Sequence, residues 1–478
     1  MQALPITNGF YTSPSLPASA QQCTNWYVNV NETEGALFPE NLFGTPGSEF
    51  LTSSGAGSIN RGGWIMAGVP YFVNGELLYR LNRDFTLDAL GVVPGTRRVS
   101  MSDNGRQLCV MVPGGAASKG YIFTADPDTF TEITDPDFRA SGNPQYVVFV
   151  DGFFVFTTDS KKFICSELND GLNYNALDFG TAEADPDDIV APIVIRNQLF
   201  IGGSETMEAF QNIGGAGFPF QRTGLFITKG ISAPLSIINA SDTFMFIGAG
   251  KNESPAIWSL EGNSVSKVST VPIDAILQSI TDVELEEVFA WSYAQKGAYF
   301  VGFSLPSTTL VIETISGRWH ERKSRIIDPH EQVQIVRSRI NSLVSAYGLV
   351  LVGDSQDGRI GSLDPETYTE YGNPIIRVVA TQPFSVTPGE SFTVPKLELM
   401  MESGVGNADV PDPSVIMERS GNGKTWKDGR AKRIGKVGEY DWRSIWRRNG
   451  RVARFEVFRF TFSDAVKPVI LGLMGDLL

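Results

Sequence analysis

A short hairpin-like unit recurs along most of this 478-residue chain. Each unit has an apolar strand, a polar turn and a second strand rich in β-branched and aromatic residues, as in "YVVFVDGFFVFTT" (146–158). Asn-Gly or Asp-Gly between alternating apolar runs is a strong hairpin signal. The first interval between turns is 30 residues, and the later ones are about 45–55, close to the length of a propeller blade. The turns fall near Asn74, Asn104, Gly152, Asn197, Ser241, Gly297 and Gly348.

This repeat predicts an all-β chain whose residues 61–372 form a six- or seven-bladed β-propeller. Radial repetition suits many short strands because it leaves only short, protected strand edges. Residues 1–60 are expected to form an N-terminal arm with strands available to close the propeller.

One segment has a helical pattern instead. In "VPIDAILQSITDVELEEVFAWSY" (271–293), Ile273, Ile276, Leu277 and Ile280 follow the i, i+3, i+4, i+7 spacing. Asp282 is placed to cap a second helical turn. The segment therefore predicts one short helical insertion.

The blade rhythm stops after "YTEYGNPIIR". Three later segments, 396–404, 414–426 and 453–463, have the pattern of strands. They predict a separate C-terminal β-sandwich-like domain over residues 373–478.

The formal charge of -14 and the low pI argue against a general nucleic-acid binder, which needs cations to neutralise phosphates. Charge is uneven: residues 376–478 hold 16 Lys+Arg and 12 Asp+Glu, so the rest of the chain holds 23 and 41. A basic C-terminal part on an acidic body suggests oriented assembly, although a merely soluble acidic surface is also compatible. Cys23, Cys109 and Cys165 form no CxxC, and neither a signal peptide nor a membrane span is predicted.

The stretch "SGNGKTWKDGR" (420–430) resembles two motifs of known chemistry. A phosphate-binding loop would need a glycine at position 418, which is Glu418. The "Asp-box" of sialidase propellers is closer, but its usual aspartate is absent, and that box only ties a hairpin turn. The stretch therefore predicts a β-hairpin turn with a buried Trp426.

No metal, cofactor or catalytic site is predicted, and the chain is not expected to be an enzyme. The only histidines, His320 and His330, form no metal motif, and His320 is expected to be packed or at the surface. "DPDD" (185–188) has calcium-binding residue types, but acidic turns usually stay solvated. Paired carboxylates for glycoside cleavage stay open, because any two of the 53 acidic residues could meet in space.

The most distinctive feature is a basic run over residues 424–454 with interleaved Trp442 and Trp446. It fits a solvated sheet face with Arg–carboxylate pairs, an arginine-rich protein interface, or stacking on nucleic acid. The residues predicted to contact a neighbouring subunit or partner are Arg443, Arg447, Arg448, Arg451, Arg454 and Trp446.

Several segments together resemble the podovirus tail-hub proteins, also called packaged-DNA stabilisation proteins. The likeness spans nearly the whole chain, although "RSGNGKTW" (419–426) lacks the two aspartates usual at that place in the family. The segments are "SAQQCTNWY" (19–27), "FGTPG" (43–47), "ELNDGLNYNALDFGTAEADPDDIV" (167–190), "FPFQRTG" (218–224), "VSTVPIDAILQ" (268–278), "GRWHERKS" (317–324), "LVGDSQDGRIGSLDPETYTEYGNPIIR" (351–377) and "GKVGEYDWRSIWRRNGRVARFEVF" (435–458).

The resemblance implies a structural virion component of the tail, made in the host bacterial cytoplasm. It implies a homo-oligomeric, hexameric ring below the portal and its adaptor protein. It also implies that the ring extends the DNA channel without binding DNA specifically, attaches a tailspike or tail fibre, and receives the needle or plug that retains the genome. The alternative from a different class is a glycan-binding or sialidase-like propeller, which would need arginines and acids clustered in the central funnel.

Overall fold

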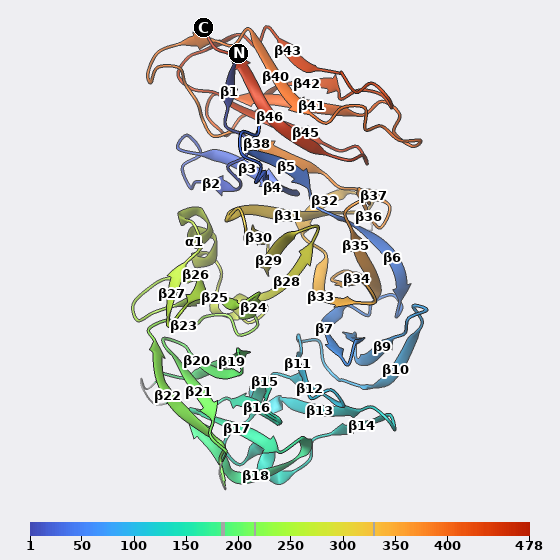
Figure 1. Ribbon diagram of the computed structural model, residues 1–478, viewed down its shortest axis with the longest axis vertical. Helices are drawn as coiled ribbons and strands as arrows, with labels where there is room; N and C mark the ends of the chain where they lie inside the picture. Colours follow the sequence, from blue (N-terminus) through green and yellow to red (C-terminus); the bar gives the residue numbers. More distant parts are fainter. Residues whose placement is uncertain (183–186, 215–216, 328–329) are drawn as a thin grey trace.

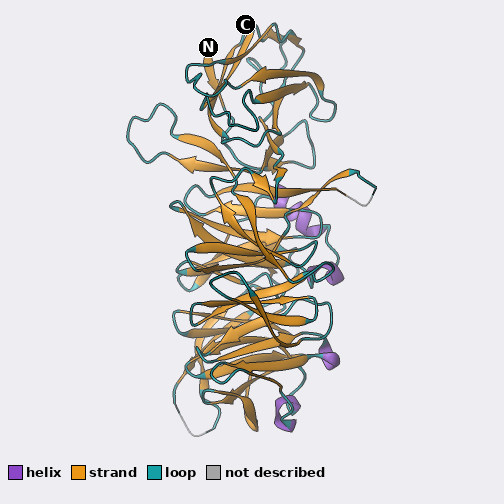
Figure 2. Cartoon of the chain, turned by 90° about the vertical axis from the view of Figure 1, so that its right-hand side faces the viewer, coloured by secondary structure: helices purple, strands orange, loops and turns teal. Residues whose placement is uncertain are grey.

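The computed structural model describes residues 1–182, 187–214, 217–327 and 330–478, and in them the chain is almost entirely β. A propeller forms the larger part, and a β-sandwich that carries both termini caps one edge of it (Figure 1). In the perpendicular view the molecule is elongated, and the few helical turns lie along one side (Figure 2).

The first four blades are separate four-stranded antiparallel sheets. Their strands are β7 (Asn60–Met66), β8 (Val69–Asn74), β9 (Leu77–Leu81) and β10 (Leu87–Val92); β11 (Ser100–Asp103), β12 (Gln107–Val112), β13 (Lys119–Thr124) and β14 (Thr129–Glu132); β15 (Pro144–Val150), β16 (Phe153–Thr158), β17 (Lys162–Glu167) and β18 (Asp170–Thr181); and β19 (Ile189–Ile195), β20 (Gln198–Gly203), β21 (Met207–Asn212) and β22 (Phe220–Ile227).

Three further blades complete a seven-bladed ring in the described chain, within the predicted range. An N-terminal strand, β6, is the fourth strand of the last blade: it pairs with β35 on one side and with the short β36 on the other. The strands are β23 (Gly230–Ile231), β24 (Ile238–Ala240), β25 (Thr243–Ala249), β26 (Ala256–Glu261) and β27 (Ser264–Lys267); β28 (Phe289–Gln295), β29 (Ala298–Ser304), β30 (Thr309–Glu313) and β31 (Arg318–Ile327), with β32 (Val333–Arg337) paired to β31; and β33 (Ile340–Ala346), β34 (Leu349–Asp354), β35 (Arg359–Asp364) and β6 (Gly47–Ser53), followed by β36 (Thr369–Glu370) and β37 (Asn373–Pro374).

The predicted turns link the first and second strands of their blades, with one exception. Asp151 and Gly152 both have positive φ, as a two-residue hairpin turn requires. The exception is Asn74, which precedes the turn between the second and third strands, β8 and β9. The first hairpin of that blade turns at Ala67 and Gly68 instead. This shift explains the short first interval.

The sandwich consists of two sheets and takes strands from both ends of the chain. Short strands β39 (Phe392–Thr393) and β44 (Arg451–Val452) pair beside it. One sheet has β1 (Gln2–Leu4), β4 (Trp26–Val30), β5 (Glu40–Gly44), β46 (Val469–Asp476), β40 (Lys396–Met401) and β43 (Ser444–Arg447); the other has β2 (Tyr11–Thr12), β3 (Ala20–Thr24), β38 (Arg377–Ala380), β45 (Val457–Phe462), β41 (Ser414–Ser420) and β42 (Lys427–Arg433).

The sandwich core is continuous with the propeller. Trp26 of the N-terminal segment is fully buried and meets Phe462 edge-on, with ring centroids 5.0 Å apart. The same apolar cluster includes Phe303 and Trp319 of the sixth blade. Because this core crosses the junction, the two parts are joined by packing as well as by the chain.

The predicted helical insertion comprises α1 (Val271–Gln278) and α2 (Asp282–Leu285). Ile273 and Leu277 of α1 are fully buried, as the spacing predicts. The predicted cap was wrong by one residue: Thr281 caps α2, and Glu284 reciprocates by accepting from the Thr281 amide at 3.0 Å. Thr281 and Glu284 form a capping box, a signal that the sequence already contained.

Candidate assembly surface and cavities

The turn after β41 is a local hairpin device. The Asn422 Oδ1 atom accepts hydrogen bonds from the amides of Lys424 at 2.8 Å and Thr425 at 2.9 Å. These amides are therefore occupied by the turn itself. Trp426 is only partly buried, so the prediction of a buried ring was wrong; the guanidinium of Arg459 lies 4.0 Å from its ring centroid.

Part of the basic run forms ion pairs within the sandwich. Arg443 makes two hydrogen bonds to Glu398, at 2.6 and 2.5 Å, and Glu398 is 5% exposed. Arg433 pairs with Asp412 at 2.5 Å and with Glu439 at 2.8 Å. Arg443 is thus occupied by an internal partner, although it was predicted to contact a neighbour.

Trp446 is a core residue, so its predicted place at a partner surface was wrong. Its side chain is fully buried, and its Nε1 atom donates to the Arg430 carbonyl at 2.9 Å. Its ring lies 5.5 Å from that of Phe460. Along β43 buried and more exposed residues alternate, with Ser444 and Trp446 inside and Arg447 outside. This two-residue period was the signal that separates Trp446 from the arginines.

The other predicted contact residues lie at the surface. Arg447, Arg448, Arg451 and Arg454 are all exposed. Arg451 donates to the Ser391 hydroxyl at 2.6 Å. Arg447, Arg448 and Arg454 have no ion-pair partner among the residues that the structure describes. We call these four arginines the basic edge of the sandwich.

The loop that carries Arg447 and Arg448 is held from two sides. The Arg448 amide donates to the Pro395 carbonyl at 2.8 Å, and the Asn449 amide donates to that of Val394 at 3.1 Å. From the other side, Arg430 donates to the Arg447 carbonyl at 3.0 Å. The loop backbone is therefore fixed, and it presents two exposed cationic side chains.

The residues considered for metal binding or acid–base chemistry either make structural contacts within the fold or lie outside the described residues. His320 is buried between Tyr27 and Phe300, and burial, with a smaller effect of Arg322, lowers its pKa well below the ordinary value. Of "DPDD", Asp185 and Pro186 lie outside the described residues, whereas Asp187 accepts from the amides of Glu205 and Thr206. Within the described chain, no group of three or more His, Cys, Asp or Glu side chains is arranged to hold a metal ion.

The propeller has a central cavity of about 660 Å³ between its innermost strands. Its lining is mainly apolar, with Trp64, Phe149 and Trp291 among the largest side chains. This volume is that of a small-molecule pocket. Double-stranded DNA, whose major groove alone is about 12 Å wide, does not fit through it.

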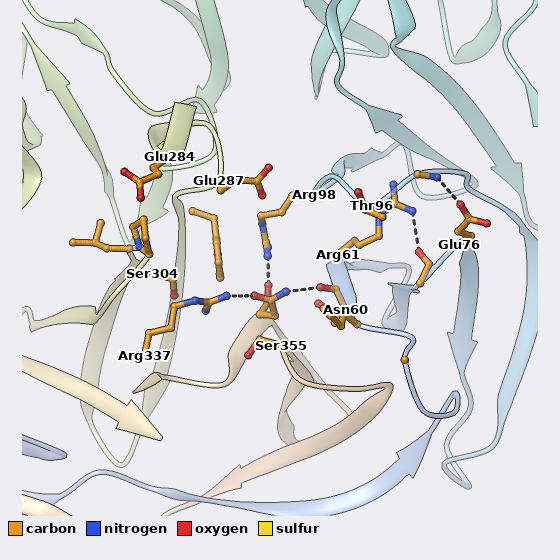
Figure 3. A pocket seen from close by; sticks show the side chains of 18 of the residues that line it. Asn60, Arg61, Glu76, Thr96, Arg98, Glu284, Glu287, Ser304, Arg337 and Ser355 are labelled. Carbon is orange, nitrogen blue, oxygen red and sulfur yellow. Dashed lines mark hydrogen bonds between the residues drawn. The ribbon is translucent and has the colours of Figure 1, made fainter. Parts of the chain in front are cut away.

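A second cavity, of about 690 Å³, lies next to the central one and shares Arg98 and Phe289 with it. It is formed by the first, sixth and last blades and the helical insertion (Figure 3). Arg61, Arg98 and Arg337 line it together with Glu76, Glu284 and Glu287. These residues are far apart in sequence, and no local motif marked them. We call this cavity the arginine pocket.

Two family models together match nearly the whole chain. The model described as "Bacteriophage P22 Gp10, beta-propeller" matches residues 2–368, and "Bacteriophage P22 Gp10, beta-sandwich" matches residues 377–474. The fold and these matches define a structural phage protein built from a propeller and a sandwich. The chain belongs to the bacteriophage P22 Gp10 family of proteins that stabilise packaged DNA.

No curated protein matches the chain. Among solved structures, the WD40 propeller domain of Doa1 has 12% identity and a TM-score of 0.40, covering 66% of this chain and 98% of its own. PorZ of the type-IX secretion system of Porphyromonas gingivalis has 8% identity and a TM-score of 0.38, covering 72% and 44%. Such distant similarities do not bear on function. No helix of the described residues is long and apolar enough to cross a membrane.

Proposed function

We propose that this protein is a non-enzymatic tail hub located in the virion and made in the host bacterial cytoplasm. In this role six copies form a ring below the portal adaptor, extend the DNA channel and help to retain the packaged genome. The ring attaches the tailspike or tail fibre and receives the needle. The match of both Gp10 family models, to residues 2–368 and 377–474, carries this proposal.

The charge distribution supports a head-to-tail contact between copies. A closed ring uses two different surfaces of each subunit. The basic edge offers cations on a fixed loop, whereas the rest of the chain is strongly acidic. We therefore infer that Arg447 and Arg448 contact acidic groups of a neighbouring subunit or of the adaptor, where such complementarity sets orientation and register.

A second exposed surface fits the same scheme. Strands β31 and β32 extend from the sixth blade as a two-stranded ribbon (Figure 2). Ile327, Val333 and Ile335 on this ribbon are each at least half exposed. We propose that a neighbouring component covers them in the assembled tail, because a group of exposed apolar side chains marks a surface that contacts another molecule.

DNA is proposed to pass through a lumen between the copies. The central cavity of one propeller is too small for a duplex. A net charge of -14 repels phosphates, so DNA can slide without being gripped.

The assembly proposal is tested by reversing charge on the basic edge. The double variant Arg447→Glu/Arg448→Glu should fold with an unchanged melting temperature, because both side chains are exposed and unpaired within the described chain. Phage carrying it should yield few DNA-filled, infectious particles. The control is Arg106→Glu/Lys251→Glu, two exposed cations of the propeller. Normal titres from the Arg447/Arg448 variant would refute the role of the basic edge.

The arginine pocket favours a second candidate, a glycan-binding or sialidase-like propeller. Arginines and acids converge in it beside the central cavity, as that class requires. A fluorogenic sialoside hydrolysed by the purified protein would favour this candidate. The hub assignment predicts no hydrolysis and a ring when the protein is imaged together with adaptor-bearing heads.

A further inference from the structure

The arginine pocket contains two arginine side chains that form no ion pair with a described carboxylate. Arg98 precedes β11 and Arg337 ends β32 (Figure 3), and Asn341 of β33 accepts hydrogen bonds from both. The Nη2 atom of Arg98 donates to the Asn341 carbonyl at 2.6 Å, and the Nη2 atom of Arg337 donates to the Asn341 Oδ1 at 3.0 Å. One asparagine therefore holds both guanidinium groups in a single site.

Arg98 has hydrogen-bonding capacity to spare. Its Nε and Nη1 atoms are buried and have no hydrogen-bond partner among the described residues. Its guanidinium carbon lies 3.4 Å from the centroid of the Phe289 ring. Burial, with the nearby charge of Arg337 adding to it, lowers the pKa of Arg98 to about 9. Buried donors without acceptors are costly, so this arrangement calls for a ligand.

Arg337 likewise has no ion-pair partner among the described residues. Besides Asn341 it donates only to the Ser338 carbonyl, at 3.2 Å, among the described groups. Burial lowers its pKa below the ordinary value. Neither Arg98 nor Arg337 forms an ion pair with a described carboxylate, although Glu287 lines the same pocket.

Two other buried arginines of the propeller, Arg61 and Arg339, are held by groups of the chain itself. Arg61, in the same pocket, donates to the carbonyls of Gly75, Val93, Pro94 and Arg97. Arg339 pairs with buried Asp354 at 2.7 Å. Arg98 differs from Arg61 because two of its buried nitrogen atoms have no hydrogen-bond partner in the described chain. Arg98 and Arg337 differ from Arg339 because neither forms an ion pair with a described carboxylate. The contrast identifies them as the functional pair of the pocket.

We propose that the arginine pocket binds a small organic acid through a single carboxylate held between Arg98 and Arg337. The planar guanidinium fork matches a carboxylate. Ile59, Val283 and Leu305 supply apolar wall, which suits an organic ligand more than a bare inorganic anion. Glu76, Glu284 and Glu287 repel a polyanion such as DNA but accept hydrogen bonds from ligand hydroxyls. This inference does not depend on the hub assignment.

Calorimetric titration of the full chain tests the proposal, with sodium glucuronate, sodium benzoate and inorganic phosphate as probes at constant ionic strength. Glucuronate or benzoate should bind saturably, and inorganic phosphate more weakly. Arg98→Gln and Arg337→Gln should each raise the dissociation constant about 10-fold or more, the usual effect of losing a charged hydrogen bond. Arg97→Gln is the matched control, because Arg97 is exposed and pairs with Glu286 instead.

Two results of the titration would overturn the proposal. The first is that neither organic acid binds the wild-type protein. The second is that inorganic phosphate binds as tightly as the organic acids or more tightly. If an arginine variant fails to fold, a crystal structure of the wild-type protein soaked with the tighter-binding acid tests the site. A carboxylate within hydrogen-bond distance of Arg98 or Arg337 supports the site, and a carboxylate bound elsewhere overturns it.

Discussion

Ser48 pairs with Leu363 across the last blade, although the two residues are more than three hundred positions apart. Ser48 belongs to β6 and Leu363 to β35, so a strand from the N-terminal segment closes the propeller. The residues before β6 continue into the sandwich. The first fifty or so residues therefore hold both parts of the protein together.

The closing pair of strands leaves no room for a side chain at Gly361. A Cβ atom there would lie 2.5 Å from the Glu49 carbonyl oxygen and 2.7 Å from the Tyr371 ring. We expect Gly361→Ala to lower the free energy of unfolding by about 1–3 kcal/mol, the usual cost of overpacking. Thermal unfolding followed by calorimetry measures it.

Gly429→Ala is the control for that experiment. Its added Cβ would have no atom closer than 3.9 Å. The control should change stability by less than about 0.5 kcal/mol. Equal melting temperatures for the two variants would show that the closure does not constrain Gly361.

Arg443 is expected to matter for stability and not for assembly. Glu398 is nearly buried, and in Arg443→Ala the only cation left near its carboxylate is Lys396, at 3.8 Å. The expected result is a lower denaturation midpoint, because the nearly buried Glu398 carboxylate loses its hydrogen-bond donors. Arg454→Ala, an exposed position without an ion pair in the described chain, should be neutral. Chemical denaturation of both variants distinguishes the roles, and a neutral Arg443→Ala would contradict the internal pairing.

Glu370 should make stability fall as pH rises from about 4.5 to 7. Burial raises the pKa of its carboxyl to about 7, against a smaller opposing effect of the hydrogen bond from the Ser324 hydroxyl. Between pH 4.5, the ordinary value, and pH 7, the unfolded state ionises while the folded state keeps its proton. This costs the folded state on the order of 2–3 kcal/mol by pH 7.

Glu370→Gln tests this linkage because it keeps the shape without the titration. As pH rises from 5 to 8, the stability of the variant relative to wild type should increase up to about pH 7 and then level off. Melting temperatures measured across that range suffice. A stability difference that is constant with pH would exclude Glu370 as the titrating group.

His320 should act in the opposite direction. Its pKa is lowered well below 6.5, so below that pH the unfolded state takes up a proton that the folded state refuses. Stability is then lost as pH falls, by about 1.4 kcal/mol per pH unit until the folded-state pKa is reached. His320→Phe, which keeps a planar ring between Tyr27 and Phe300, should flatten the decline between pH 6.5 and 5 in thermal unfolding. An unchanged decline would mean that other groups cause it.

Sequence patterns predicted the local structure of this chain well. The Asp151–Gly152 turn lies where its composition indicates, because a two-residue hairpin depends on the φ values of its own residues. The strands around 396–401 and 457–462 likewise follow from alternation of apolar residues. Trp446 was mispredicted. Buried and exposed residues alternate along β43 as well, but the neighbouring arginines led to the prediction that Trp446 is exposed.

The sequence by itself determined the all-β class, the repeated hairpins and the family, because turn preferences, two-residue periodicity and ordered motifs are local properties. Only the tertiary structure decided that β6 closes the propeller, that Trp446 is buried, and that Arg98 and Arg337 share Asn341. These relationships join segments far apart in the chain. Their partners are selected by packing and by the need to satisfy buried polar groups, which no local pattern encodes.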